Sequence, residues 1–237
     1  MSRNRTLVGA LAAVLLLVPL AGCGGGTDKP KAENKSENPT AFVKRLTRAM
    51  AKQHTAKIDL ELGSSLSATA SIEYSDTDTS MAVTMITGPQ TVNVVLADGV
   101  MYLQQTKGSK YLKIDKSDPA LGSLAGQLAD FGPKAAVGSL EGAVTKVTDK
   151  GTETIDGQEL DHYELAVDTK KASSIFGVPA GSAKTPARVK YQFWVDSDDL
   201  LRQAELKVNG QTLVMKVSDW GKPVTITVPP TSQVITR

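Results

Sequence analysis

Apolar and polar residues alternate along much of the chain after residue 57, and this period of two predicts β-strands. Three such segments lie between residues 58 and 85, with apolar positions at Ile58, Leu60, Leu62, Leu66, Ala68, Ala70, Ile72, Tyr74, Met81, Val83 and Met85. Gly63-Ser64, the polar run SDTDTS (75–80) and Gly88-Pro89 supply turns between and after them. We therefore expect an antiparallel sheet that buries one face.

Three two-residue turns indicate further hairpins: Asp98-Gly99, Asp156-Gly157 and Asn209-Gly210. The last of these pairs Val208 with Gln211. It therefore places Leu206 opposite Leu213 and Ala204 opposite Met215.

Treating Asp198-Asp199 as another tight turn pairs Val195 with Arg202, Phe193 with Ala204 and Tyr191 with Leu206. Both turns assign the same residues to one apolar face, and these are our candidate cavity residues: Tyr191, Phe193, Val195, Ala204, Leu206, Leu213 and Met215. Ala204 is small and should leave room in the middle of that face. The opposite face carries Trp194, Gln203, Glu205, Lys207, Thr212 and Lys216.

A helix is expected before the first strand. Asn38 suits an N-cap and Pro39 the first turn. Apolar residues then recur at helical spacing up to about Gln53: Phe42, Leu46, Ala49 and Met50. Leu46 is therefore a candidate for covering the apolar face.

Residues 118–144 are apolar but rich in glycine. Leu121, Leu124, Leu128 and Phe131 share one helical stripe, and Val137 and Leu140 continue it after Pro133. Each interior glycine costs a helix roughly 1 kcal/mol relative to alanine, and this segment contains five. Two interpretations of this segment are possible at this stage: a mobile lid or a glycine-rich core helix. A short helix is also expected around Lys170 to Phe176.

The N-terminus has the layout of an export signal: Arg3 and Arg5 precede an uncharged apolar stretch from Leu7 to Leu20. It ends in Leu20-Ala21-Gly22-Cys23, which resembles the lipobox of bacterial lipoproteins, and Cys23 is the chain's single cysteine. The resemblance implies that residues 1–22 are a signal peptide and that the Cys23 thiol carries diacylglycerol. A plain secretory leader with an incidental thiol is the alternative.

Residues 23–38 would then be the lipidated cysteine and a flexible tether, because Gly24 to Asn38 holds no large apolar side chain. Residues 39–237 are about the size of one domain. Without the leader's two arginines, the remaining 25 basic residues equal the 25 acidic ones. This balance argues against nucleic acid as a partner and predicts no polybasic second membrane anchor.

Motifs for catalysis or metal binding are absent from the sequence. The two histidines, His54 and His162, have no ligand spacing around them, and there is no nucleophile elbow, phosphate loop or dinucleotide fingerprint. Aspartates at turns, such as Asp76 and Asp198, are more often solvated turn formers than calcium ligands. We expect no enzyme, no metal and no cofactor.

The lipobox, the tether, the first helix and the long sheet together resemble the LppX/LprG-type lipoproteins of actinobacteria. The segments ADGVMYLQ and YQFWVDSDDLLRQAEL carry most of this likeness. The resemblance implies an α+β fold: one large curved antiparallel sheet, or half-barrel, with helices over its concave apolar face, as in LolA-type carriers. It further implies that acyl chains of a lipid or lipidated glycan lie in the hollow.

The function expected from this resemblance is that of a lipid carrier of the cell envelope. The protein would be anchored to the extracytoplasmic face of the cell membrane through acyl chains such as palmitate on Cys23. An acylated lipid or lipoglycan would be its ligand and an export transporter a further partner. A sensor or interaction lipoprotein with a filled core is the alternative, and an envelope hydrolase ranks below both.

Overall fold

The computed structural model describes residues 35–75, 79–115, 118, 132–172, 174–175, 178–179, 186–208 and 210–236. All of them lie in one compact unit, Ala32–Arg237. Cys23 and the helical stripe of Leu121, Leu124, Leu128 and Phe131 lie outside the described residues.

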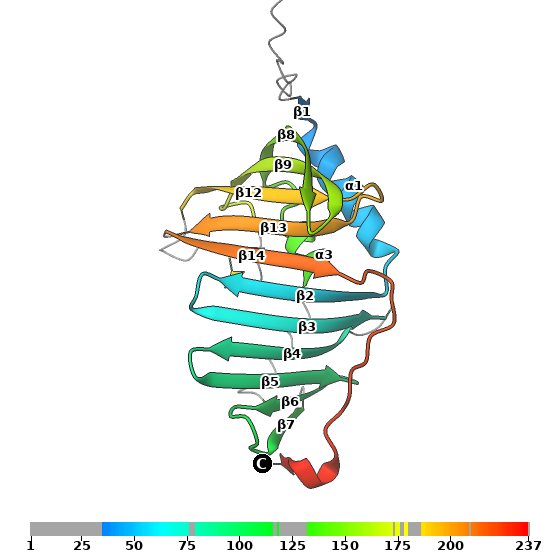
Figure 1. Ribbon diagram of the computed structural model, residues 1–237, viewed down its shortest axis with the longest axis vertical. Coiled ribbons are helices and arrows are strands. Elements are labelled where there is room, and N and C mark those ends of the chain that lie inside the picture. The colour runs from blue at the N-terminus through cyan, green and yellow to red at the C-terminus, as the bar shows by residue number, and fades with distance from the viewer. Residues whose placement is uncertain are drawn as a thin grey trace, which may run out of the picture. The chain divides into compact units, whose positions relative to one another are not determined.

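Most of the described chain forms one open sheet, as Figure 1 shows. Its thirteen strands follow the order β1-β8-β9-β12-β13-β14-β2-β3-β4-β5-β6-β7-β15, and neighbours are antiparallel except β15, which is parallel to β7. This confirms the expected large antiparallel sheet. The strands are β1 (Ser36–Glu37), β2 (Thr55–Leu62), β3 (Leu66–Tyr74), β4 (Thr79–Thr87), β5 (Gln90–Ala97), β6 (Val100–Gln104), β7 (Tyr111–Asp115), β8 (Val144–Ile155), β9 (Gln158–Asp168), β12 (Arg188–Val195), β13 (Leu201–Val208), β14 (Gln211–Ser218) and β15 (Val234–Thr236).

Two α-helices accompany this sheet within the described residues, α1 (Pro39–Ala51) and α3 (Pro133–Gly138), together with a 3-10 turn, η1 (Thr231–Gln233). The first helix is confirmed: the Asn38 side chain accepts a hydrogen bond from the Ala41 amide at 3.0 Å. Its apolar residues Phe42, Val43, Leu46 and Met50 are buried. The Phe42 ring packs 4.8 Å from the Tyr163 ring of β9, so α1 lies on the apolar face of the sheet.

The predicted hairpin registers are largely confirmed. Ala97 pairs with Val100 and Ile155 with Gln158, so two residues form each turn. Asp98 and Asp156 both adopt φ near +50°, which a two-residue hairpin of this kind requires. Strands β12, β13 and β14 pair as expected over most of their length, from Tyr191–Leu206 to Val208–Gln211.

The expected tight turn at Asp198-Asp199 is wrong. Val195 pairs with Leu201 rather than Arg202, because the connection is a longer loop built around Asp196. The Asp196 carboxylate accepts hydrogen bonds from the amides of Asp198 and Leu200, each at 3.0 Å. Its second oxygen accepts from the Arg202 guanidinium at 2.6 Å. A buried, fully bonded carboxylate thus fixes this loop and shifts the register by one residue.

Two other expectations need correction. Around Lys170 to Phe176 the described residues form a turn, followed by a small hairpin of β10 (Ser174–Ile175) and β11 (Val178–Pro179), instead of a helix. The turn forms because the Lys170 amide bonds to the Asp168 side chain and the Lys171 amide to the Asp168 carbonyl. Ser36 and Glu37, which we assigned to the tether, pair with β8 as an edge strand.

Gly132 precedes α3 where the chain crosses the apolar face. Its φ is +122°, a conformation that side chains rarely adopt. A Cβ at this position would lie 2.9 Å from the Tyr74 hydroxyl and 3.0 Å from Ile72 Cδ1. Only glycine therefore lets α3 approach β3 this closely.

We expect Gly132→Ala to lower the free energy of unfolding by about 1–3 kcal/mol, because it adds backbone strain and a steric clash. Gly138→Ala is the matched control, since its Cβ would meet nothing within 4 Å and its φ is not positive. That variant should change stability by less than about 1 kcal/mol. Urea unfolding compares the two, and equal effects would show that the close approach at Gly132 is not required.

Candidate functional site

The apolar face of the sheet is organised in rows of paired residues that run across the strands. The row nearest the start of β2 holds Ala56, Ile72, Met81, Leu96, Met101 and Ile114, one residue from each strand between β2 and β7. None of these side chains is more than 2% exposed. We call this set the closed row.

Exposure increases in the rows further from this end. Some side chains on the same face of β14 and of β2 to β7 are only half-buried: Leu60, Leu62, Leu66, Met85, Val92, Leu103, Leu112 and Leu213. Most of them belong to two rows that pair across the sheet, Met215–Leu60–Ala68–Met85–Val92 and Leu206–Leu213–Leu62–Leu66. We call these eight residues the open apolar band.

The C-terminal segment, which lies at one end of the strands, determines which rows are closed and which are open. The C-terminal segment after β14 runs along one set of strand ends and returns to the sheet as β15 (Figure 1). It is fixed to β2 at Thr55, whose carbonyl accepts from the Gly221 amide at 3.1 Å and whose hydroxyl donates to the Lys222 carbonyl at 2.7 Å. The closed row begins next to Thr55, whereas Leu62 and Leu66 flank the β2–β3 turn at the other end.

Most of the predicted cavity residues that the structure describes belong to the packed core. Tyr191, Phe193, Val195, Ala204, Leu206 and Met215 are at most 2% exposed, and Leu46 is 0% exposed. Ala204 has no exposed surface, so the room expected beside it is filled. Leu213 alone among these residues is half-buried and lies in the open apolar band.

Sequence reasoning missed that the open surface is centred on β2, β3 and β4. Alternation marks Leu60, Leu62, Leu66 and Met85 as buried, in the same way as the core residues beside them. Only the register of each strand against its neighbours, together with the path of the C-terminal segment, separates open rows from closed ones.

Two tyrosines lie on the apolar face, Tyr74 next to the closed row and Tyr191 in the row of Leu206. Burial raises the pKa of both hydroxyls, so both remain protonated. The Lys134 ammonium lies 3.9 Å from the Tyr74 ring centroid and donates to the Gln53 carbonyl at 2.6 Å; burial lowers its pKa. Among the described residues there is no group of three potential metal ligands.

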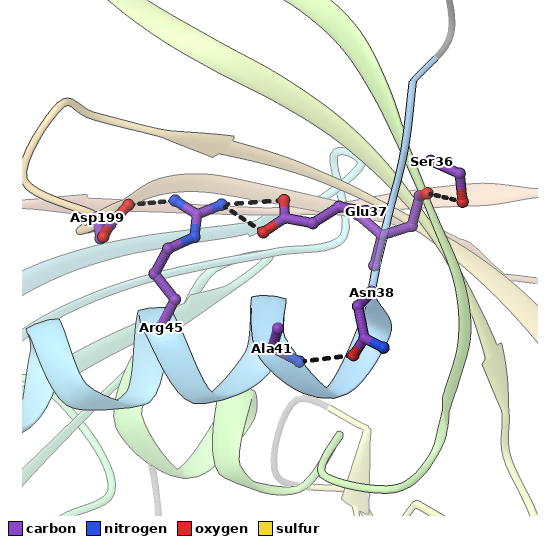
Figure 2. Close-up of polar contacts among 7 residues, drawn as sticks. Ser36, Glu37, Asn38, Ala41, Arg45 and Asp199 are labelled. Carbon is purple, nitrogen blue, oxygen red and sulfur yellow. Dashed lines mark hydrogen bonds and ion pairs between the residues drawn. The ribbon is translucent and has the colours of Figure 1, made fainter.

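Arg45 holds α1 in place at the edge of the sheet (Figure 2). Its guanidinium bonds to Glu37 of β1 at 3.1 Å and to Asp199 of the β12–β13 loop. Its central carbon also lies 5.3 Å from the Phe42 ring centroid and 5.8 Å from that of Tyr163. Burial lowers the Arg45 pKa, but the hydrogen bond to Asp199 and its other partners more than offset this and raise it.

Comparison with solved structures identifies the class of fold as that of mycobacterial lipoproteins. The crystal structure of LprF from Mycobacterium bovis matches with a TM-score of 0.60, covering 82% of this chain and 99% of that one at 17% identity. LppX from Mycobacterium tuberculosis matches with a TM-score of 0.56, covering 79% and 97% at 13% identity.

The LppX_LprAFG lipoprotein family model matches residues 38–226, so this chain belongs to that family. It is also 26% identical over 234 residues to a protein of Mycobacteroides abscessus named lipoarabinomannan carrier protein LprG, covering 96% of this chain and 99% of the relative. In the part of the chain that the structure describes, no helix is long and apolar enough to span a membrane.

Arg45→Gln should lower the free energy of unfolding by about 1–2 kcal/mol. The side chain is 32% exposed, so each ion pair contributes modestly and the aromatic contacts add to them. Arg48→Gln, an exposed arginine one turn further on, is the control and should change stability by less than about 0.5 kcal/mol. Urea unfolding measures both, and an Arg45→Gln effect as small as the control's would exclude Arg45 as the residue that fixes α1.

Proposed function

We propose that this protein is a membrane-anchored lipoprotein of the bacterial envelope that binds the acyl chains of a lipid or lipidated glycan and carries them across the envelope. The observation that carries the proposal is the open apolar band. It is contiguous across β14 and β2 to β7, yet it belongs to the same face as a fully buried core. Leu60, Val92, Leu103 and Leu112 still pack against the core, so the band is the partly exposed margin of the apolar face. A run of half-buried apolar side chains of this kind is a suitable surface for a ligand or partner.

The chemistry of the band suits acyl chains. Its members are leucines, a valine and a methionine, without a charged side chain among them. Each methylene that moves from water into such an environment contributes about 0.8 kcal/mol, so one long chain supplies enough free energy for tight binding. The methionine at 85 adds a flexible, polarisable contact that adapts to different chain shapes.

The family relationship supports the same reading and indicates a cargo class. The relative from Mycobacteroides abscessus is named as a carrier of lipoarabinomannan, which is an acylated glycan. A glycan head is polar and would remain in water, while its acyl chains would lie on the band. We therefore propose an acylated lipid or lipoglycan as the ligand, and an export transporter as its donor or acceptor.

The principal alternative is an interaction or sensor lipoprotein of the same fold whose band is covered by its own chain or by another protein. The distribution of burial favours the carrier. A core filled by the protein itself should bury all rows alike, whereas here burial is complete in the closed row and falls across the face.

Lipid extraction tests the proposal directly. Residues 27–237 contain every residue that the structure describes. When this chain is purified from lipid-containing cells and extracted with organic solvent, mass spectrometry should find acylated lipid at close to one molecule per chain. A protein with a filled core would yield none.

The same assay locates the binding surface through Ala68→Trp. Ala68 lies between Leu60 and Met85 in the paired row, so an indole there would occupy the surface that acyl chains need. Because Ala68 is only 8% exposed, we expect the indole to cost about 1–3 kcal/mol of stability without unfolding the protein, and the bound lipid to be lost. Thr69→Trp, on the opposite face of β3 and exposed, is the matched control and should retain lipid. Stoichiometric lipid on Ala68→Trp would place the binding surface elsewhere.

The proposed anchor is tested at Cys23. Cys23→Ser removes the only thiol that can be acylated, so the protein should leave the membrane fraction without a change in melting temperature. Cell fractionation followed by immunoblotting measures this. Retention of the serine variant in the membrane fraction would contradict anchoring through Cys23.

A further inference from the structure

The outer surface of α1 carries positive charge only. The helix sequence PTAFVKRLTRAMA contains Lys44, Arg45 and Arg48 but no acidic residue, and Lys52 is its C-cap. Lys44, Arg48 and Lys52 are spaced four residues apart and all three are exposed. Residues at this spacing lie one above another on a helix, so the three form a single line, which we call the cationic stripe.

The charges of the stripe have no ion-pair partner among the residues that the structure describes. Arg45 differs from them because it pairs with Glu37 and Asp199. Within the described residues, no ion pair is found for Lys44, Arg48 or Lys52. Like charges four residues apart destabilise a helix, so the arrangement opposes folding and needs an explanation outside the fold.

A groove of about 730 Å³ runs beside the stripe, between α1 and the loop after β12. All three stripe residues line it, together with Arg45 and the loop residues Asp198 and Asp199. Two acidic residues line the groove. Asp199 pairs with Arg45, whereas Asp198 does not. The groove is therefore electropositive, since four cations and two carboxylates line it, and it is open to solvent.

We infer that the cationic stripe docks this domain on a bilayer of anionic phospholipids, with lipid phosphates entering the groove. Charge complementarity is the first argument, since ammonium and guanidinium groups are the usual partners of phosphate. The second is position: the chain joins the sheet at Ser36, directly before α1, so the tether after the proposed anchor at Cys23 spans residues 24–35. About 12 residues reach at most roughly 40 Å, so the start of α1 stays near the membrane, where even weak attraction is effective.

Docking would restrict how the tethered domain is oriented relative to the membrane. A flexible tether alone lets the domain turn freely above the membrane. Contact through one helix gives the domain a fixed orientation, with α1 towards the lipid surface. The total charge of the chain conceals this feature, because the acidic residues that balance it lie outside α1.

Vesicle flotation tests the inference with unacylated chain that starts at Gly24, so that the lipid anchor does not contribute. The chain should bind vesicles of phosphatidylcholine with 30 mol% phosphatidylglycerol at 0.1 M salt and not bind pure phosphatidylcholine. Changing Lys44, Arg48 and Lys52 together to glutamine should weaken binding about 100-fold. The melting temperature should not fall, because like-charge repulsion is removed.

A second triple variant controls for total charge. Lys107, Lys110 and Lys207 are exposed and lie on other elements, so changing them to glutamine removes the same charge elsewhere. Equal weakening by both triples would overturn the inference, as would equal binding to neutral vesicles. A site for a small free anion would instead be shown if glycerol phosphate displaced the chain better than sodium chloride at equal ionic strength, and this would also overturn docking.

This test is independent of cargo binding. A failure of the carrier proposal would remove copurifying lipid from the extraction and leave flotation unchanged. A failure of docking would abolish the difference between the two triple variants and leave extraction unchanged.

Discussion

Period-two alternation maintained through consecutive strands makes one face of this sheet apolar over most strands between its two edge strands, and that face must be covered. Thirteen strands about 4.8 Å apart extend over roughly 55–60 Å, whereas a helix with its side chains is about 10 Å wide. The two α-helices that the structure describes cover only part of such a surface. The arrangement of closed and open rows is consistent with this mismatch, which leaves the half-buried apolar surface that we propose as the ligand-binding surface.

The cover that exists depends on where α1 is fixed. Its buried residues supply the attraction to the sheet, but apolar packing alone allows a helix to slide or rotate on a smooth face. Arg45 removes this freedom because one guanidinium bonds to β1 and to the β12–β13 loop while lying over two aromatic rings. The loop is itself held by the buried Asp196 carboxylate. The turn of α1 that contains Arg45 is thereby bonded both to the edge strand β1 and to the β12–β13 loop.

The parts of the fold that the sequence predicts are those set by local pattern. The Asn38 cap, the Asp98-Gly99 turn and the face of β13 depend on neighbouring residues, and alternation or turn chemistry reveals them. The loop at Asp196 was missed because its carboxylate replaces the backbone bonds of a tight turn with side-chain bonds, which residue type alone does not disclose. The predicted cavity residues are buried on the apolar face, as alternation indicates, but which rows of that face are half-buried depends on long-range register and on the path of the C-terminal segment.

Closing one end of the face also explains how the other end can stay open. Burying a side chain such as Ile72 or Met81 contributes about 1.5–3 kcal/mol, and the closed row repeats this on the five adjacent strands β3 to β7. That gain is large beside the usual 5–15 kcal/mol stability of a domain, and it does not depend on a ligand. The leucines near the β2–β3 turn are only half-buried, so they contribute less to the free energy of folding, and the closed row compensates for this smaller contribution. Because Thr55 fixes the C-terminal segment beside the closed row, the half-buried apolar side chains lie towards the β2–β3 turn, and the proposed ligand would approach the band from that end.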